Sequence, residues 1–82
     1  MNASSAQTPT SPEAAIDFDL RGEFIPLDAL LKATSLASSG GQARALISAG
    51  EVRVDDQVEL RKTCKIRRDQ QVRFAGTLIR VR

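Results

Sequence analysis

The sequence contains no histidine, no tryptophan and no tyrosine, and its single cysteine is Cys64. Without histidine, neither a Ser–His–Asp triad nor a histidine-activated cysteine nucleophile can be assembled. A lone cysteine forms no intramolecular disulfide and, without histidine, completes none of the usual zinc ligand sets. We therefore expect neither catalysis nor a metal or other cofactor. Cys64 is predicted to be a small, half-buried residue of a strand in a reducing, cytoplasmic setting.

Long apolar runs are also absent, since none approaches the roughly 20 residues that a membrane span needs. Residues 1–14 consist mainly of small polar side chains and include Pro9 and Pro12. They have neither the basic start and apolar run of a secretory signal nor the arginine of a transit peptide. Such a segment buries too little apolar surface to order itself. We expect a disordered tail over 1–14, one domain over 15–82, and no membrane partner.

The net charge of +2 conceals an uneven distribution along the chain. Residues 1–30 carry one base against five acids, whereas residues 31–82 carry eleven bases against five acids. The two parts therefore have net charges of −4 and +6. This asymmetry favours a polyanionic partner for the second part, and the alternative is an ordinary mixed, solvated surface.

Apolar spacing predicts two short helices. A helix over 26–34, with Pro26 in its first position, has an apolar stripe at Leu27, Leu30 and Leu31. A second helix starts with a capping box, in which Ser39 is the N-cap and Gln42 lies three residues on, and Gly50 ends it. Its apolar stripe consists of Ala43, Leu46 and Ile47.

Alternation at period two predicts the strands. Residues 16–20 form one strand, and the alternation resumes after Gly50 as a hairpin whose turn is Asp55-Asp56. Further short strands are expected at 64–66, 72–74 and 78–81. The paired carboxylates are turn residues here rather than a general acid and base. The order of elements predicts an α+β fold, with two short helices packed on a small antiparallel sheet with a β-hairpin.

The segment 61–68 contains five bases and no acid. If Cys64 and Ile66 point inward from a strand, then the outward face carries the bases Arg61, Lys65 and Arg67. Arg53 on the hairpin and Arg44 on the exposed side of the second helix also point outward. Bases from several elements could then converge into one phosphate-binding patch, with a merely solvated charged face as the alternative.

The start of the second helix offers another phosphate-binding feature. A helix N-terminus presents free N–H groups and the positive end of the helix dipole. Gly40 and Gly41 would let a phosphate approach these N–H groups closely. The alternative is that the two glycines only shape the helix start.

Residues 24–76 resemble the RNA-binding domain first defined in ribosomal small-subunit protein four, the S-four domain or alpha-L motif. The resemblance is carried by the segments Leu27–Lys32, Ser39–Ile47 and Gly50–Asp56. Within it, the chain is most similar to small stand-alone bacterial, ribosome-associated members, through Arg61–Ile66 and Phe74–Gly76. It departs from the pattern at Gly40, where many members have arginine, at Asp56, where they have glycine, and at the turn 69–72.

The resemblance implies binding of structured RNA, such as ribosomal RNA or the ribosome itself, by a monomer without a small-molecule substrate. The positions that match the family's RNA-contacting residues, together with the bases around them, are Ser39, Gly40, Gln42, Arg44, Lys32, Arg53, Arg61, Lys62 and Lys65. Gly41 and Arg67 join this set from the charge and helix-start arguments above.

The aromatic residues refine the expected mode of recognition. Phe18, Phe24 and Phe74 are the only aromatics, and each fits a core position. Proteins that read single-stranded bases usually display aromatic side chains for stacking. We therefore expect recognition of folded RNA through its backbone and shape, with weak sequence preference.

Two other functions remain open from the sequence. A helix-turn-helix DNA binder would use the second helix, but Arg44 is its only base and the gap from Thr34 to Gly40 exceeds the usual turn. A protein-interaction module could instead turn the basic face towards an acidic partner.

Overall fold

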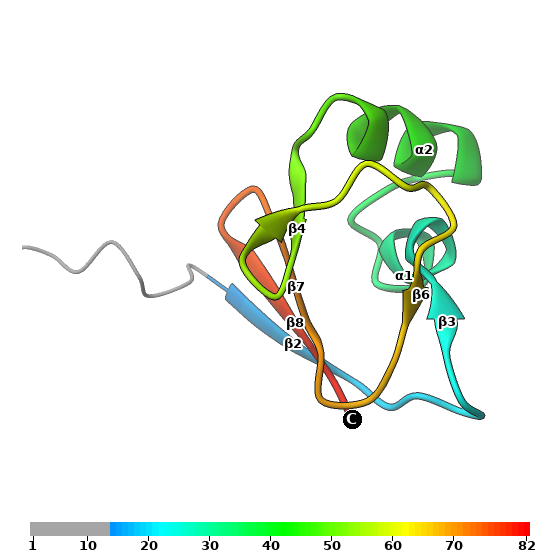
Figure 1. Ribbon diagram of the computed structural model, residues 1–82, viewed down its shortest axis with the longest axis vertical. Helices are drawn as coiled ribbons and strands as arrows, with labels where there is room; N and C mark the ends of the chain where they lie inside the picture. Colours follow the sequence, from blue (N-terminus) through cyan, green and yellow to red (C-terminus); the bar gives the residue numbers. More distant parts are fainter. Residues whose placement is uncertain (1–13) are drawn as a thin grey trace, which may run out of the picture.

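The computed structural model describes residues 14–82, which fold into two helices and two small sheets. The helices lie together on one side of the larger sheet (Figure 1). The elements are β2 (Ala14–Phe18), β3 (Ile25–Pro26), α1 (Leu27–Ala33), α2 (Gly40–Ser48), β4 (Val52–Val54), β5 (Gln57–Val58), β6 (Lys65–Ile66), β7 (Gln71–Phe74) and β8 (Thr77–Val81). The predicted α+β fold class is confirmed. The tail predicted over 1–14 lies outside the described residues, except for Ala14, which begins β2.

The larger sheet is mixed, whereas the sequence predicted a purely antiparallel sheet. Its strand order is β2-β8-β7-β4-β5, and β2 pairs with β8 in parallel. Parallel strands need a long connection, and here both helices and the hairpin lie between the two strands along the chain. The backbone continues the pairing beyond the strand, since the N–H of Leu20 donates to the carbonyl of Arg82 at 2.8 Å. The two ends of the domain are therefore held side by side.

The apolar stripes of both helices face one core. The α1 side chains of Leu27, Leu30 and Leu31 are fully buried, as are Ala43 and Ile47 of α2. They belong to the same cluster as Val52, Val72 and Ile79 from three strands of the larger sheet. Pro26 is the N-cap of α1 and not its first helical residue, because its extended backbone ends β3.

The β4–β5 hairpin forms as predicted. Asp55 and Asp56 both have positive φ, 50° and 69°, which a two-residue turn of this type requires at both central positions. The carboxylate of Asp55 accepts hydrogen bonds from the Gln71 N–H at 3.0 Å and from the Gln70 side-chain amide at 3.1 Å. Asp55 thereby ties the turn to β7 as well as forming it.

The strand predicted at 64–66 does not join the larger sheet. β6 pairs instead with β3, matching Ile25 with Ile66 and Pro26 with Lys65. The contact runs on into the first turn of α1, where the N–H groups of Leu27 and Asp28 donate to the carbonyls of Cys64 and Lys62 at 2.9 and 3.1 Å. Helix N-terminal N–H groups lack partners within the helix, so the basic segment completes the start of α1. The pairing of β6 with β3 therefore places the basic segment 61–68 against the first turn of α1.

Within residues 14–82, no helix is long and apolar enough to cross a membrane.

Candidate nucleic-acid interface

The start of α2 is capped on one side and open on the other. The Ser39 hydroxyl accepts a hydrogen bond from the Gln42 N–H at 3.1 Å, as the capping box predicts. The reciprocal bond differs, because the Gln42 side-chain oxygen accepts from the N–H and hydroxyl of Ser38 instead. The first turn carries no acidic side chain. The N–H groups of Gly40 and Gly41 thus lie at the positive end of a helix dipole that no carboxylate of this turn offsets.

Gly40 makes room for Arg44. A Cβ atom at position 40 would lie 3.2 Å from Arg44 Nη1, closer than ordinary van der Waals contact. The Arg44 guanidinium therefore lies over Gly40, the first residue of α2, which is one helical turn towards the N-terminus from the Arg44 backbone. The family's usual arginine is missing at position 40, but a positive charge is still present beside the helix start.

Asp28 of α1 connects this helix start to the basic segment. Its Oδ2 lies 3.5 Å from Arg44 Nη1 in an exposed ion pair, and its backbone N–H donates to the Lys62 carbonyl. Lys32 is exposed and lies one helical turn beyond Asp28 on the same side of α1. Asp28 is thus the common neighbour of three predicted binding residues, Arg44, Lys62 and Lys32. We call these three bases and the residues Ser39, Gly40, Gly41 and Gln42 the helix-start group.

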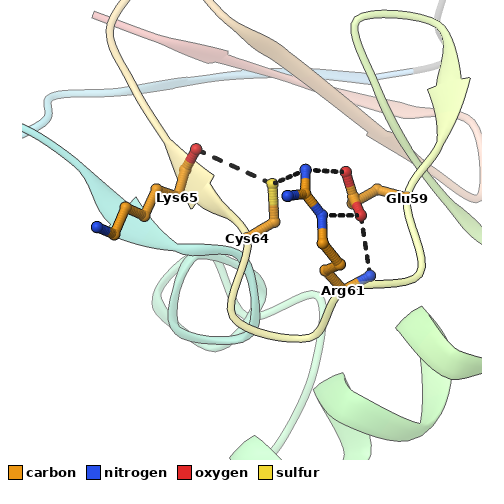
Figure 2. A network of polar contacts seen from close by, with 4 residues as sticks. All are labelled: Glu59, Arg61, Cys64 and Lys65. Atoms are coloured by element: carbon orange, nitrogen blue, oxygen red, sulfur yellow. Dashed lines mark hydrogen bonds and ion pairs between the residues drawn. The ribbon is translucent and has the colours of Figure 1, made fainter.

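Arg61 is held in place by Glu59 (Figure 2). Its Nε and Nη2 atoms lie 3.0 and 3.1 Å from the two carboxylate oxygens, and its backbone N–H donates to the same carboxylate at 2.9 Å. These hydrogen bonds to Arg61 lower the pKa of Glu59 to about 2. The Arg61 side chain remains 76% exposed. It can still meet a ligand, but its charge is offset by a fixed carboxylate.

Cys64 lies beside this pair and is half-buried, as predicted. Its Sγ atom is 3.6 Å from Arg61 Nη2. Burial, together with the nearby charge of Glu59, raises the pKa of the thiol. Cys64 therefore stays protonated at neutral pH, and the geometry supports a packing role rather than a nucleophile.

Phe24 corrects the prediction that every aromatic is a core residue. Its side chain is 38% exposed, whereas Phe18 and Phe74 pack against the core. Lys65 Nζ lies 4.9 Å from the centre of the Phe24 ring and Arg67 Cζ lies 6.0 Å from it. Both distances are within the range of cation–π contact. An exposed aromatic next to two bases is the site feature that sequence reasoning missed, because β3, which begins at the next residue, is too short to show which way Phe24 points.

An open groove of about 600 Å³ runs between the hairpin and the basic segment. Three predicted binding residues line it, Arg61, Lys65 and Arg67, and so do the carboxylates of Asp55 and Glu59. We call these three bases the groove group. The two groups are neighbours, because the segment 61–67 supplies Lys62 to one and all three bases to the other.

Two arginines of the predicted basic face differ from these groups. Arg53 lines a separate hollow of about 230 Å³ with Glu51 and Arg73, so the predicted convergence of all outward bases omits it. Arg68 donates to the backbone carbonyls of Leu20 and Gly22 at 2.8 and 2.9 Å. Although Arg68 belongs to the basic segment and also lines the groove, its guanidinium holds the connection that follows β2.

Comparison with known proteins identifies the fold. The family model described as "S4 domain" matches residues 18–82. The chain belongs to the S4 domain family. The S-four resemblance seen over 24–76 is thereby confirmed and extended to Phe18, the last residue of β2, and to Arg82, just after β8.

Two curated relatives and one solved structure are similar to this S4 domain. The Escherichia coli (strain K12) protein named "Putative RNA-binding protein YbcJ" is 48% identical over 52 residues, covering 63% of this chain and 74% of the relative. "Uncharacterized protein YbcJ" of Shigella flexneri matches to the same extent. The solution structure of E. coli YbcJ superposes with a TM-score of 0.60 at 37% identity, covering 95% of this chain and 98% of that one. It is described as having an αL motif involved in RNA-binding.

Proposed function

We propose that this S4 domain binds structured RNA through the helix-start group, with the groove group as a neighbouring cationic wall. The observation that carries the proposal is the position of Arg44 over the open start of α2, where Asp28 joins it to the backbone of Lys62. Phosphate oxygens accept hydrogen bonds both from helix N-terminal N–H groups and from guanidinium groups. One phosphate could therefore contact the backbone and Arg44 together, while Lys62 and Lys32 meet neighbouring phosphates.

The related E. coli protein supports this assignment through its RNA-binding name and the RNA-binding role given to its αL motif. The domain would act by binding alone, as a cytoplasmic monomer without cofactor or small-molecule substrate. Structured ribosomal RNA is the first ligand to test, since the sequence is most similar to ribosome-associated members of the family.

The test compares a hairpin fragment of ribosomal RNA with duplex DNA of equal length, measured by fluorescence anisotropy across a salt series. We expect tighter binding to the hairpin, and an affinity that falls as salt rises because bound phosphates release counterions. Replacing Arg44 and Lys62 by glutamine should reduce the log–log salt slope by roughly 0.7–0.9 for each lost phosphate contact. Arg61 is left intact because its removal would leave Glu59 without its partner.

The matched control changes the same number of charges elsewhere. Arg80 and Arg82 both contact Asp17 across β2 and β8, so replacing them by glutamine should leave the salt slope unchanged. Equal affinity for duplex DNA, or an unchanged slope in the Arg44 and Lys62 variant, would contradict the proposal.

A further inference from the structure

Phe24 is an exposed aromatic that the proposed contact with folded RNA does not use. Its ring lies near the cations of Lys65 and Arg67, at 4.9 and 6.0 Å. Phe24 also lines a hollow of about 290 Å³ with Phe18, Leu20 and Ile25, and Asp19 and Arg21 complete its wall. The exposed ring thus borders this hollow and lies within cation–π distance of two bases.

The two cations connect Phe24 to the groove. Lys65 and Arg67 line the groove of the preceding subsection, and neither makes an ion pair with a carboxylate of residues 14–82. Their positive charges are therefore available to an anion that lies in the groove. An anionic ligand that also has a flat aromatic part would match both features.

A nucleotide is such a ligand, since it joins a flat base to a phosphate. Base stacking on an aromatic side chain accepts any base and requires that the base be unpaired. A protein or peptide partner would instead need an acidic group and an aromatic group from two side chains held side by side, whereas one nucleotide supplies both.

We propose that Phe24, Lys65 and Arg67 form a stacking site for one unpaired nucleotide next to the structured part of the bound RNA. The base stacks on the exposed part of the Phe24 ring, and Lys65 and Arg67 hold its phosphate. This inference rests on the proposed function and narrows its substrate class, from a folded RNA to a folded RNA with an unpaired neighbour. It also gives a role to an aromatic that the sequence had assigned to the core.

The test uses one two-stranded RNA duplex in two forms, blunt and with a four-nucleotide unpaired extension at the 3′ end of each strand. We expect the full chain to bind the extended form roughly fivefold more tightly or better, which is the lower end of the effect of one stacked base. Phe24→Leu should lose this gain and still bind the blunt form normally. Phe24→Tyr keeps a ring and should retain the gain. Leu60→Ala removes another exposed apolar side chain, 58% exposed and outside the groove, and should change neither affinity.

A second measurement works on the unaltered protein. The ring protons of Phe24 should shift upfield in NMR spectra on addition of the extended form and not on addition of the blunt form. If both forms bind equally and the ring does not shift, the stacking site is wrong while the proposed function stands. If the chain binds neither form, the proposed function is wrong and the stacking site with it.

Discussion

Three arginines on or next to the strands of the larger sheet differ in their partners from four bases around the helix starts and the groove. Arg80 of β8 and Arg82 just after it lie 2.9 and 3.4 Å from the same carboxylate, that of Asp17, and Arg73 of β7 lies 3.5 Å from Asp56. By contrast, no carboxylate of residues 14–82 forms an ion pair with Lys32, Lys62, Lys65 or Arg67. We call the first set the sheet arginines and the second set the free bases.

This difference shows why a charge count is a poor guide to the interface. Residues 31–82 have a surplus of six positive charges. Part of this positive surplus forms ion pairs with acids from the first thirty residues, because parallel pairing of β2 with β8 places Asp17 opposite Arg80. The four free bases lie near the helix starts and the groove, whereas Arg53, which also has no ion pair within residues 14–82, lies in a separate hollow.

The largest expected effect separates the two sets directly. Replacing all four free bases by glutamine should weaken binding to the RNA hairpin by about 100-fold or more, because each loses a phosphate contact of the order of 1 kcal/mol. Replacing the three sheet arginines by glutamine should leave affinity within about twofold and lower the free energy of unfolding by about 1 kcal/mol or less. Anisotropy and urea unfolding of both variants check this, and a reversed pattern would refute the division.

Arg67 and Arg68 sharpen the comparison, because they are adjacent in sequence and opposite in expected role. Arg68→Gln removes two hydrogen bonds to the carbonyls of Leu20 and Gly22 and should cost about 1–2 kcal/mol of stability. Arg67→Gln should cost little stability and weaken RNA binding severalfold. Thermal unfolding and anisotropy on each single variant measure both effects. Equal stability losses would show that the two arginines are not distinguished by their partners.

Gly40→Ala should weaken RNA binding about threefold, because the new Cβ would lie 3.2 Å from Arg44 Nη1 and shift the guanidinium by a few tenths of an ångström from its place at the helix start. Its stability should not fall, since the crowded atom is the end of a flexible side chain and alanine reduces the freedom of the unfolded chain. In an Arg44→Gln background the same substitution should have no further effect on binding. A full threefold loss in that background would remove Arg44 from the explanation.

The smallest expected effect is on the free energy of unfolding at acid pH. Pairing with Arg61 lowers the pKa of Glu59 from 4.5 to about 2, so the ionised carboxylate stabilises the folded protein at neutral pH. That contribution is fully present above pH about 4.5 and is lost as the pH falls towards 2. Urea unfolding at pH 6 and pH 3 should therefore show a smaller loss of stability in Glu59→Gln than in the unaltered chain. Identical losses would mean that the Glu59–Arg61 pair adds nothing to folding.

Local features of the fold could be predicted from the sequence because they depend on nearby residues. The stripe of Leu27, Leu30 and Leu31, the Ser39 cap and the Asp55-Asp56 turn each follow from spacing over a few positions, and each is present. The pairings of β2 with β8 and of β3 with β6 join residues about 40 or more positions apart. Nothing in a short window of sequence selects those partners.

The candidate site could be predicted in part for the same reason. Within the helix-start group, the residues from Ser39 to Arg44 come from one continuous segment, so their proximity follows from α2 itself, whereas Lys32 and Lys62 are brought there by the fold. The exposure of Phe24 and the fastening role of Arg68 depend on where distant segments pack. Alternation correctly predicted that Lys65 is exposed and Ile66 buried, but it cannot show that the segment 61–67 lies against α1 rather than in the larger sheet.

The most direct test of the division between free bases and sheet arginines is an NMR titration of the ¹⁵N-labelled chain with an RNA hairpin. The account predicts that amide signals of Gly40, Gly41, Lys62 and Lys65 move, while those of Arg80 and Arg82 stay in place. Shifts concentrated on β2 and β8, or spread evenly over the chain, would contradict it.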